Sequence, residues 1–331
     1  MIIQNKKTIN FNTEFSFYFK QKEAKLNKSK MAEQKLNLDV AGAVSELETL
    51  MKRVLPKNIL YQIVLGKGLE FDGYSDYTEK DDASLIDWKA SVRGKKLFIR
   101  KYIEERDLKF IFLVDVSDNM VFGSTEKLKC EYAAELAAAL SHLILINGDR
   151  FGFFLYNEDI VSRRAPELGN KQFEIFVSEL SNPLIYNGGS NLNKVLDTLP
   201  NDLDRNTAMI FIISDFVKLD ETYQKNLEIL ASLFEIVAVI VRDPLDSHLP
   251  ILDKELVIEN PETKEKLLIN PKIAAKIYEE NAFKQLSLVK KIFQNNNVDF
   301  LELSTEKSFA EEFAVFLKER ISGGRVVKIK K

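Results

Sequence analysis

The stretch Phe110-Ile111-Phe112-Leu113-Val114-Asp115 decides the fold, because it is an unbroken apolar run that ends in a carboxylate. A strand with apolar residues on both sides must be buried on both faces, as in a parallel sheet covered by helices. Working outward from it, comparable apolar runs occur at residues 150–156, 208–213 and 236–241. We therefore expect these four segments to be strands of one mostly parallel sheet.

Segments with helical spacing alternate with these strands. The longest is residues 125–146, which are rich in Ala and Leu and end before Gly148. Regular alternation of strands and helices predicts an α/β fold with a doubly wound, mostly parallel sheet and helices on both faces. We also expect helices at 173–180, 192–199, 221–233, 273–293 and 309–320, a β-hairpin insertion at 255–269 and a strand at 298–303.

The part before the sheet is predicted to be an α+β extension. Residues 38–56 have helical spacing and end at a proline, whereas residues 60–105 are expected to form short strands and turns. We divide the chain into a disordered extension at 1–30, a helix and small segment at 38–105, and the α/β domain at 106–322. Residues 1–30 have no apolar segment typical of a secretory signal.

We expect the notable side chains of the small segment before the sheet to have structural roles. Trp88, the only tryptophan, is expected to pack in the core, since aromatic side chains contribute a large buried area. Asp81 and Asp82 can cap a helix. Glu104 and Glu105 are expected to pair with basic residues, namely Arg93, Arg100 and Lys101.

The composition excludes several classes of protein. One cysteine rules out an intramolecular disulfide and a cysteine-based zinc site, and two histidines provide no histidine cluster. The net charge of −3 argues against a broad nucleic-acid surface. No apolar run reaches the length of a membrane span. We therefore expect a cytoplasmic protein.

Polar residues gather where the predicted strands end. Asp115 is followed by Ser117 and Asn119, Gly189-Ser190 opens a helix, and Asp215 follows the strand at 208–213. Ligands of open α/β sheets bind at the carboxyl ends of the strands. Carboxylate, hydroxyl and amide oxygens suit a hard divalent cation, so we predict a site for Mg²⁺ or, alternatively, Mn²⁺ or Ca²⁺. Each element alone is more typical of a polar turn in which Asp or Ser caps the following helix, so the prediction rests on the three elements together.

These residues resemble the metal-ion-dependent adhesion site of von Willebrand factor A domains, which have a Rossmann-like fold. That site has the pattern Asp-x-Ser-x-Ser, then a Thr, then an Asp. Here Asn119 replaces the second Ser and Ser190 replaces the Thr. The resemblance implies that a carboxylate of a partner protein completes the metal shell. Four residues beside the predicted ligands are candidate partner contacts, namely Asp118, Asn187, Gly188 and Gly189.

A narrower resemblance begins near residue 60. The segments Ile86-Asp87-Trp88-Lys89-Ala90-Ser91, Gly148-Asp149-Arg150 and Arg242-Asp243-Pro244 are similar to the domain of unknown function 58 family, which has a von Willebrand A-like core. Members of that family resemble partners of MoxR-type AAA+ ATPases. The resemblance therefore implies a non-enzymatic module that acts in the maturation of protein complexes.

Two alternatives remain open at this point. A metal-free interaction scaffold would keep the fold and the partner but not use the metal site. A metal-dependent phosphohydrolase would use Asp115 as a nucleophile, but this chemistry usually needs a second acid two residues on, where the chain has Ser117. No phosphate-binding loop supports a nucleotide-binding enzyme.

Overall fold

The structure is a computed structural model that describes residues 35–54, 70–78, 86–103, 108–250, 252, 255–259 and 266–322. The predictions on residues 1–30, on the Asp81-Asp82 pair and on pairing with Glu104 and Glu105 lie outside the described residues.

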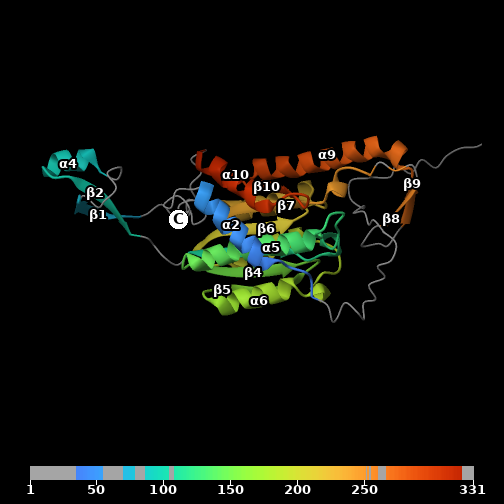
Figure 1. Cartoon of the computed structure of the whole chain (residues 1–331), viewed down its shortest axis with the longest axis horizontal. Helices are drawn as coiled ribbons and strands as arrows, with labels where there is room; N and C mark the ends of the chain where they lie inside the picture. The colour runs from blue at the N-terminus through green and yellow to red at the C-terminus, as the bar shows by residue number, and fades with distance from the viewer. Residues whose placement is uncertain are drawn as a thin grey trace, which may run out of the picture.

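A six-stranded sheet forms the centre of the molecule, with the strand order β10-β7-β6-β3-β4-β5 (Figure 1). Five strands are parallel, and β5 pairs with β4 in the antiparallel direction. The strands are β3 (Lys109–Asp115), β4 (Arg150–Tyr156), β5 (Ile160–Glu167), β6 (Thr207–Ser214), β7 (Glu235–Arg242) and β10 (Asp299–Ser304). The predicted doubly wound, mostly parallel sheet is confirmed. Strand β5 was not predicted, because its residues are largely polar and it lies at the sheet edge.

Helices cover both faces of this sheet (Figure 1). One face carries α2 (Val40–Val54), α5 (Lys129–Ile146), α6 (Asn170–Leu180) and α10 (Phe309–Ser322). The other face carries α7 (Leu192–Asp202), α8 (Gln224–Leu233) and α9 (Pro271–Asn295). The predicted helices are confirmed, with ends that shift by a few residues.

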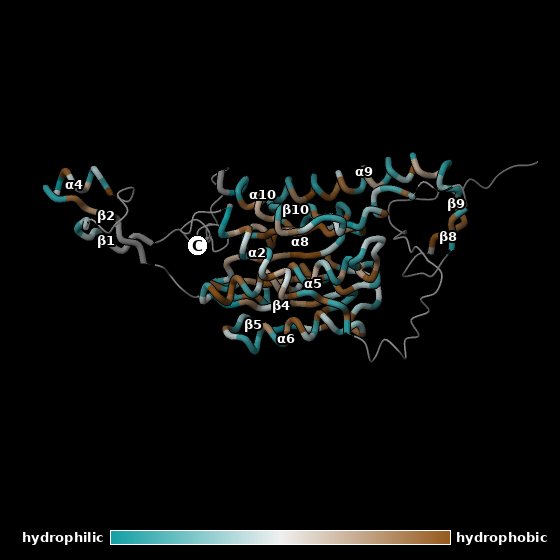
Figure 2. Tube along the Cα trace, in the orientation of Figure 1, coloured by the Kyte–Doolittle hydropathy of each residue, from teal (hydrophilic) through white to brown (hydrophobic). Residues whose placement is uncertain are grey.

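Alternate residues of each strand pack into opposite halves of the core. In β3, Phe110, Phe112 and Val114 pack toward α5, whereas Ile111 and Leu113 pack toward α7 and α8. Successive side chains of a strand point to opposite faces, so an apolar residue at every position is required where helices cover both. Figure 2 shows these strands as the hydrophobic interior of the main body.

Helix α2 packs against α5 and α10, although it precedes the sheet by more than fifty residues of sequence. Its residues Leu47 and Met51 are fully buried and belong to the same core cluster as β3. The amide of Asp39, at the start of this helix, donates a hydrogen bond to Glu135 of α5 at 2.7 Å. The proposed division of the chain between 38–105 and 106–322 stays a prediction.

Two small β-units lie outside the central sheet. Strand β1 (Glu70–Asp76) pairs with β2 (Phe98–Ile103), and the short helix α4 (Trp88–Gly94) lies against β2. Strands β8 (Leu256–Glu259) and β9 (Lys266–Ile269) form the predicted hairpin. Figure 1 shows these two units at opposite ends of the molecule.

The prediction that Trp88 packs in the core is wrong. Its side chain is 65% exposed on α4. The unit made of β1, β2 and α4 is too small to surround a tryptophan on all sides, and the residue of α4 that turns inward is the small Ser91.

Candidate metal and partner site

The candidate site lies where the chain reverses direction along the sheet. Strand β3 has β4 on one side and β6 on the other. The connection after β3 leads to β4 on one side, whereas the connection after β6 leads to β7 on the other side. At such a switch point the loops after two adjacent strands separate and leave room for a ligand. The carboxyl end of β3 is Asp115, and β6 ends at Ser214 beside it. The topology therefore brings the predicted ligands that follow β3 next to the one that follows β6.

Asp115 is the centre of a hydrogen-bond cluster. Its Oδ2 atom accepts hydrogen bonds from the hydroxyls of Ser190 at 2.8 Å and Ser214 at 2.7 Å. Its Oδ1 atom accepts from the backbone amide of Ser117 at 2.9 Å. The carboxylate is 1% exposed. Three separate segments of the chain thus converge on one buried carboxylate, as the sequence predicted for Asp115, Ser117 and Ser190.

The hydroxyl of Ser117 makes no hydrogen bond to any described residue, although it is fully buried. It still lies close enough to Asp115 to lower the pKa of that carboxyl. An unsatisfied buried hydroxyl costs about 1–3 kcal/mol, so it needs an explanation such as a bound ion or water. Asn119 is also buried, within the short 3-10 helix Asp118–Met120 that follows Ser117.

The loop before α7 is held against the loop after β3. The amide of Asp118 donates to the carbonyl of Gly188 at 2.9 Å, and the amide of Asn187 donates to the carbonyl of Val116 at 3.1 Å. Gly188 has a φ of +74°, which favours glycine at this turn. Gly189 donates its amide to Glu158 at 3.1 Å. The four residues predicted to contact a partner therefore lie beside the candidate ligands, and their role stays a prediction.

Asp215 is already paired with a cation from the chain itself. The ammonium of Lys129, the first residue of α5, lies 2.8 Å from Oδ2 of Asp215 and 3.2 Å from Oδ2 of Asp246. Lys129 is fully buried, with its ammonium 5.5 Å from the ring centre of Phe122. The predicted ligand Asp215 thus borders the site, but one of its oxygens is used by an ion pair.

Asp243 joins a further loop to this edge of the sheet. Its carboxylate accepts hydrogen bonds from the amide of Ser124 at 2.7 Å and the hydroxyl of Ser124 at 2.6 Å, and also from Leu245 at 2.9 Å and Thr305 at 3.3 Å. Its own amide donates to Asp246 at 2.9 Å. The loops after β3, β7 and β10 are therefore fastened together around the Lys129 ion pairs.

Ser214, Lys129 and Asp246 also belong to this arrangement and were not predicted from the sequence. A basic residue in the first turn of a helix is unfavourable beside the positive end of the helix dipole. The position of Lys129 at the start of α5 was therefore a usable signal for an acidic partner. No comparable signal marks Asp246.

The two aspartates of the candidate site differ in their preferred charge. Burial, followed by the negative charge of Asp215, raises the pKa of Asp115 above its ordinary value, and the hydrogen bonds from the Ser214 hydroxyl and the Ser117 amide oppose this only in part. Burial also acts on Asp215, but the charges of Lys129 and Arg242 outweigh it and lower the pKa of Asp215. The pKa of Lys129 is raised, because Asp215 and Asp246 outweigh the effect of burial on its ammonium. Asp115 is thus the acid that lacks a compensating cation.

The residues present fit a divalent cation bound through oxygen atoms. The unsatisfied hydroxyl of Ser117, the hydroxyl of Ser190 and the carboxylate of Asp115 form a hydroxyl-rich donor set. Among the described residues no three His, Cys, Asp or Glu side chains are grouped as a metal site. A set with one directly available carboxylate is consistent with weak binding, since affinity grows with the number of charged ligands.

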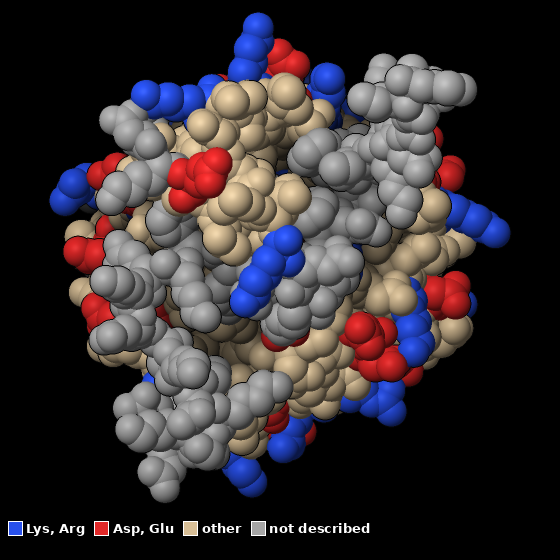
Figure 3. Space-filling model, turned by 90° about the vertical axis from the view of Figure 1, so that its right-hand side faces the viewer, with Lys and Arg blue, Asp and Glu red and all other residues tan. Residues whose placement is uncertain are grey.

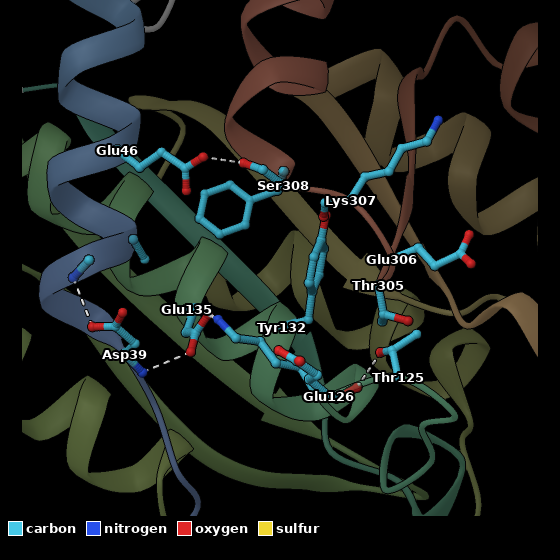
Figure 4. A pocket seen from close by; sticks show the side chains of 14 residues that line it. Asp39, Glu46, Thr125, Glu126, Tyr132, Glu135, Thr305, Glu306, Lys307 and Ser308 are labelled. Atoms are coloured by element: carbon cyan, nitrogen blue, oxygen red, sulfur yellow. Dashed lines mark hydrogen bonds and ion pairs between the residues drawn. The ribbon is translucent and has the colours of Figure 1, made fainter.

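A cavity of about 530 Å³ opens at the same edge of the sheet, between α2, the start of α5 and the loop that precedes α10, and none of the candidate ligands lines it. Figure 4 shows Glu46 bonded to Ser308 and Asp39 directed toward Glu135 in its wall. Its lining contains more carboxylates than lysines, namely Asp39, Glu46, Glu126, Glu135 and Glu306 against Lys127 and Lys307. Figure 3 shows acidic and basic side chains mixed on the face that it views.

The fold and the site place the chain among the doubly wound α/β proteins with a polar cluster at the switch point of the sheet. Within that class, residues 74–285 match the family model described as "Protein of unknown function DUF58", and the chain belongs to this family. An uncharacterized protein of Mycobacterium bovis is 26% identical over 230 residues, covering 68% of this chain and 71% of that protein. An uncharacterized protein of Mycobacterium tuberculosis has the same identity and coverage.

Solved structures are similar at a lower level. The conserved hypothetical protein BatB from Bacteroides thetaiotaomicron has a TM-score of 0.44 and 11% identity, over 65% of this chain and 99% of that one. An aerotolerance-related membrane protein from Bacteroides fragilis has a TM-score of 0.40 and 12% identity, over 64% and 99%. The SpRpn10 VWA domain has a TM-score of 0.36 and 9% identity, over 62% and 93%. No helix among the described residues combines the length and apolar character that crossing a bilayer requires.

Proposed function

We propose that this protein is a non-enzymatic protein-interaction module that binds its partner through a metal-ion-dependent adhesion site. Asp115, Ser117 and Ser190 hold a divalent cation such as Mg²⁺ or Mn²⁺, and Asn119 lies beside them. Asp215 borders the site with its charge balanced by Lys129. A partner carboxylate then completes the coordination of the ion. A cation with few negative ligands stays electrophilic, which favours this external carboxylate.

The observation that carries the proposal is the buried Ser117 hydroxyl without a hydrogen-bond partner among the described residues, next to a carboxylate with a raised pKa. The charges of the surrounding cluster support it. With every group ionised, Asp115, Asp215, Asp243 and Asp246 against Lys129 and Arg242 leave two negative charges in buried side chains. One divalent cation balances that charge, and buried charges are normally paired or coordinated to metals.

The partner that we propose is an AAA+ ATPase of the MoxR type, and the setting is the maturation of protein complexes in the cytoplasm. The resemblance of the Gly148-Asp149-Arg150 and Arg242-Asp243-Pro244 segments to the family supports this partner. The cavity lined by Tyr132 and Glu135, at the same edge of the sheet, adds surface that a partner can fill. Asp115 has no acid two residues on, so the chain lacks the second group of an aspartyl phosphohydrolase.

The experiment that tests the metal site compares the wild type with Ser117→Ala during Mn²⁺ titration of chelator-stripped protein. We expect Mn²⁺ at millimolar concentration to raise the Tm of the wild type, because a ligand that binds only the native state stabilises it. Ser117→Ala removes the unsatisfied hydroxyl, so it should leave the Tm without metal unchanged or higher and abolish the Mn²⁺ response. Ser178→Ala, a serine on α6 away from the site, is the control. A wild-type Tm that does not change with Mn²⁺ would contradict the metal-dependent form of the proposal.

The second candidate is the metal-free interaction scaffold, which the Lys129 to Asp215 ion pair specifically favours. In that case the ammonium already supplies the positive charge at the site. Capture of the AAA+ ATPase by the immobilised chain, equal with Mn²⁺ and with chelator, would select this candidate. Capture lost with chelator and lost in Ser117→Ala would select the metal-dependent site.

A further inference from the structure

The unit made of β1, β2 and α4 presents apolar and basic side chains side by side. Trp88 is 65% exposed and Val92 is 79% exposed. They are four positions apart on α4 and so lie on the same side of the helix. Lys89 and Arg93 have the same spacing and form a parallel exposed row, and Lys95 and Lys96 follow at the end of the helix, with Leu97 46% exposed next to them.

The helix that carries these residues is fixed to its strands from the other side. The carboxylate of Asp87 caps α4 by accepting from the amides of Lys89 at 3.0 Å and Ala90 at 3.1 Å. The buried hydroxyl of Ser91 accepts from the amide of Phe98 in β2 at 2.8 Å. The orientation of Trp88 and Val92 away from the strands is therefore imposed by the contacts of Asp87 and Ser91.

The charged residues of α4 and of the turn that follows it, at 88–96, are all positive and exposed. Among the described residues of the unit, the exposed cations are Lys89, Arg93, Lys95 and Lys96, and Lys96 alone has an acidic partner, Asp76 at 3.5 Å. The nearby acid, Asp87, is buried at the helix cap. The chain as a whole has a net charge of −3, so this positive surface contrasts with the rest of the protein.

We propose that this surface of α4 binds an anionic lipid membrane. Tryptophan is enriched at membrane interfaces, where its ring lies among the headgroups while its N–H stays hydrated. Lysine and arginine beside it are attracted to anionic headgroups by about fivefold in affinity for each charge. Because Trp88 and Val92 are exposed on the same side of α4, both can enter a lipid surface together.

The position of the unit leaves the candidate metal site accessible. Strand β2 ends at Ile103 and β3 begins at Lys109, so the unit is joined to the edge of the sheet where the parallel strands begin. Asp115 and Ser214 lie at the opposite edge, where these strands end. Contact of α4 with a membrane therefore does not compete with a partner at the site, and the two proposals fail independently.

Trp88 itself is the reporter for the test, because it is the only tryptophan in the chain. We expect vesicles of phosphatidylglycerol and phosphatidylcholine to shift its emission to shorter wavelength and protect it from acrylamide, with no change for pure phosphatidylcholine vesicles. High salt should reverse the shift through charge screening. The full-length chain should also sediment with the anionic vesicles.

Variants assign the binding to this surface. In co-sedimentation, Trp88→Ala should lower the partition coefficient at least about tenfold, and Lys89→Gln with Arg93→Gln should lower it roughly 25-fold. The matched controls are Phe283→Ala, an aromatic that is 72% exposed on α9, and Lys225→Gln with Lys284→Gln. Binding that persists in both α4 variants overturns the proposal. An emission shift with poly-glutamate but not with anionic vesicles also overturns it, in favour of an acidic protein partner.

Discussion

Two lysines, one buried and one exposed, show how differently the main body and the α4 unit use the same residue type. Lys129 is fully buried at the carboxyl edge of the sheet, near the ring of Phe122, and has two aspartates as partners. Lys89 is exposed on α4 beside Trp88 in sequence, with no acidic partner among the described residues. A buried ammonium must be compensated within the fold, whereas an exposed one stays available to an external anion.

This difference predicts that charge changes destabilise the sheet edge strongly and the α4 unit weakly. Four substitutions test that contrast, in order of decreasing effect. Stability is measured as the free energy of unfolding in urea by circular dichroism, and the local effect at α4 is measured by hydrogen exchange.

The largest effect is expected for Lys129→Met. Removal of the ammonium leaves Asp215 and Asp246 buried without their cation, which costs about 3–5 kcal/mol. The double variant Lys129→Met with Asp215→Asn should recover about 1–3 kcal/mol, because one of the two uncompensated charges is then gone. A loss below 1 kcal/mol in the single variant would show that the buried ion pairs do not distinguish this edge from α4.

A smaller loss is expected for Asp243→Ala. This carboxylate accepts hydrogen bonds from Ser124, Leu245 and Thr305, so its removal leaves several donors without their acceptor. We expect a cost of about 2–3 kcal/mol. Asp243→Asn keeps some of these acceptor interactions and should lose less. Equal losses in the two variants would contradict a hydrogen-bonding role.

A local effect is expected for Asp87→Ala in α4. Loss of a helix N-cap costs about 1 kcal/mol, and here the cap supports a helix of seven residues. Hydrogen exchange should accelerate at the amides of Lys89 and Ala90, which donate to Asp87, and remain slow in α5. Faster exchange in α5 would mean that α4 and the main body open together.

The smallest effect is expected for Trp88→Ala, with a change in the free energy of unfolding below about 0.5 kcal/mol. A substitution at an exposed position far from caps and buried networks rarely changes stability more than this. A core tryptophan would instead cost about 3–5 kcal/mol on truncation. A loss of that size would restore the sequence-based expectation that Trp88 packs in the core.

The buried strands could be predicted because apolar runs such as Phe110–Val114 leave few alternatives for a chain of this size. Strand β5 (Ile160–Glu167) could not be predicted, because an edge strand forms by pairing with one neighbouring strand and does not require an apolar sequence. The expected role of Trp88 failed for a related reason. Burial of an aromatic side chain stabilises a protein, which the residue type alone indicates. Whether enough of the chain surrounds that side chain depends on the fold.

In the candidate site the sequence predicted Asp115, Ser117 and Ser190, which the structure brings together around one carboxylate. Ser214 was hidden as the last residue of a buried strand, where its hydroxyl turned out to donate to Asp115. Asp215 was expected at the site and lies there, but its ion pair with Lys129 could not be foreseen from residues 86 positions apart.

The sequence by itself determined the alternation of strands and helices, and with it the edge of the sheet at which polar residues collect. Periodicity is local, so neighbouring residues suffice to specify it. Only the tertiary structure decided that Lys129 neutralises Asp215, that the Ser117 hydroxyl is left without a partner among the described residues, and that Trp88 faces outward. These three features depend on desolvation and on contacts between distant segments, which exist only once the chain has folded.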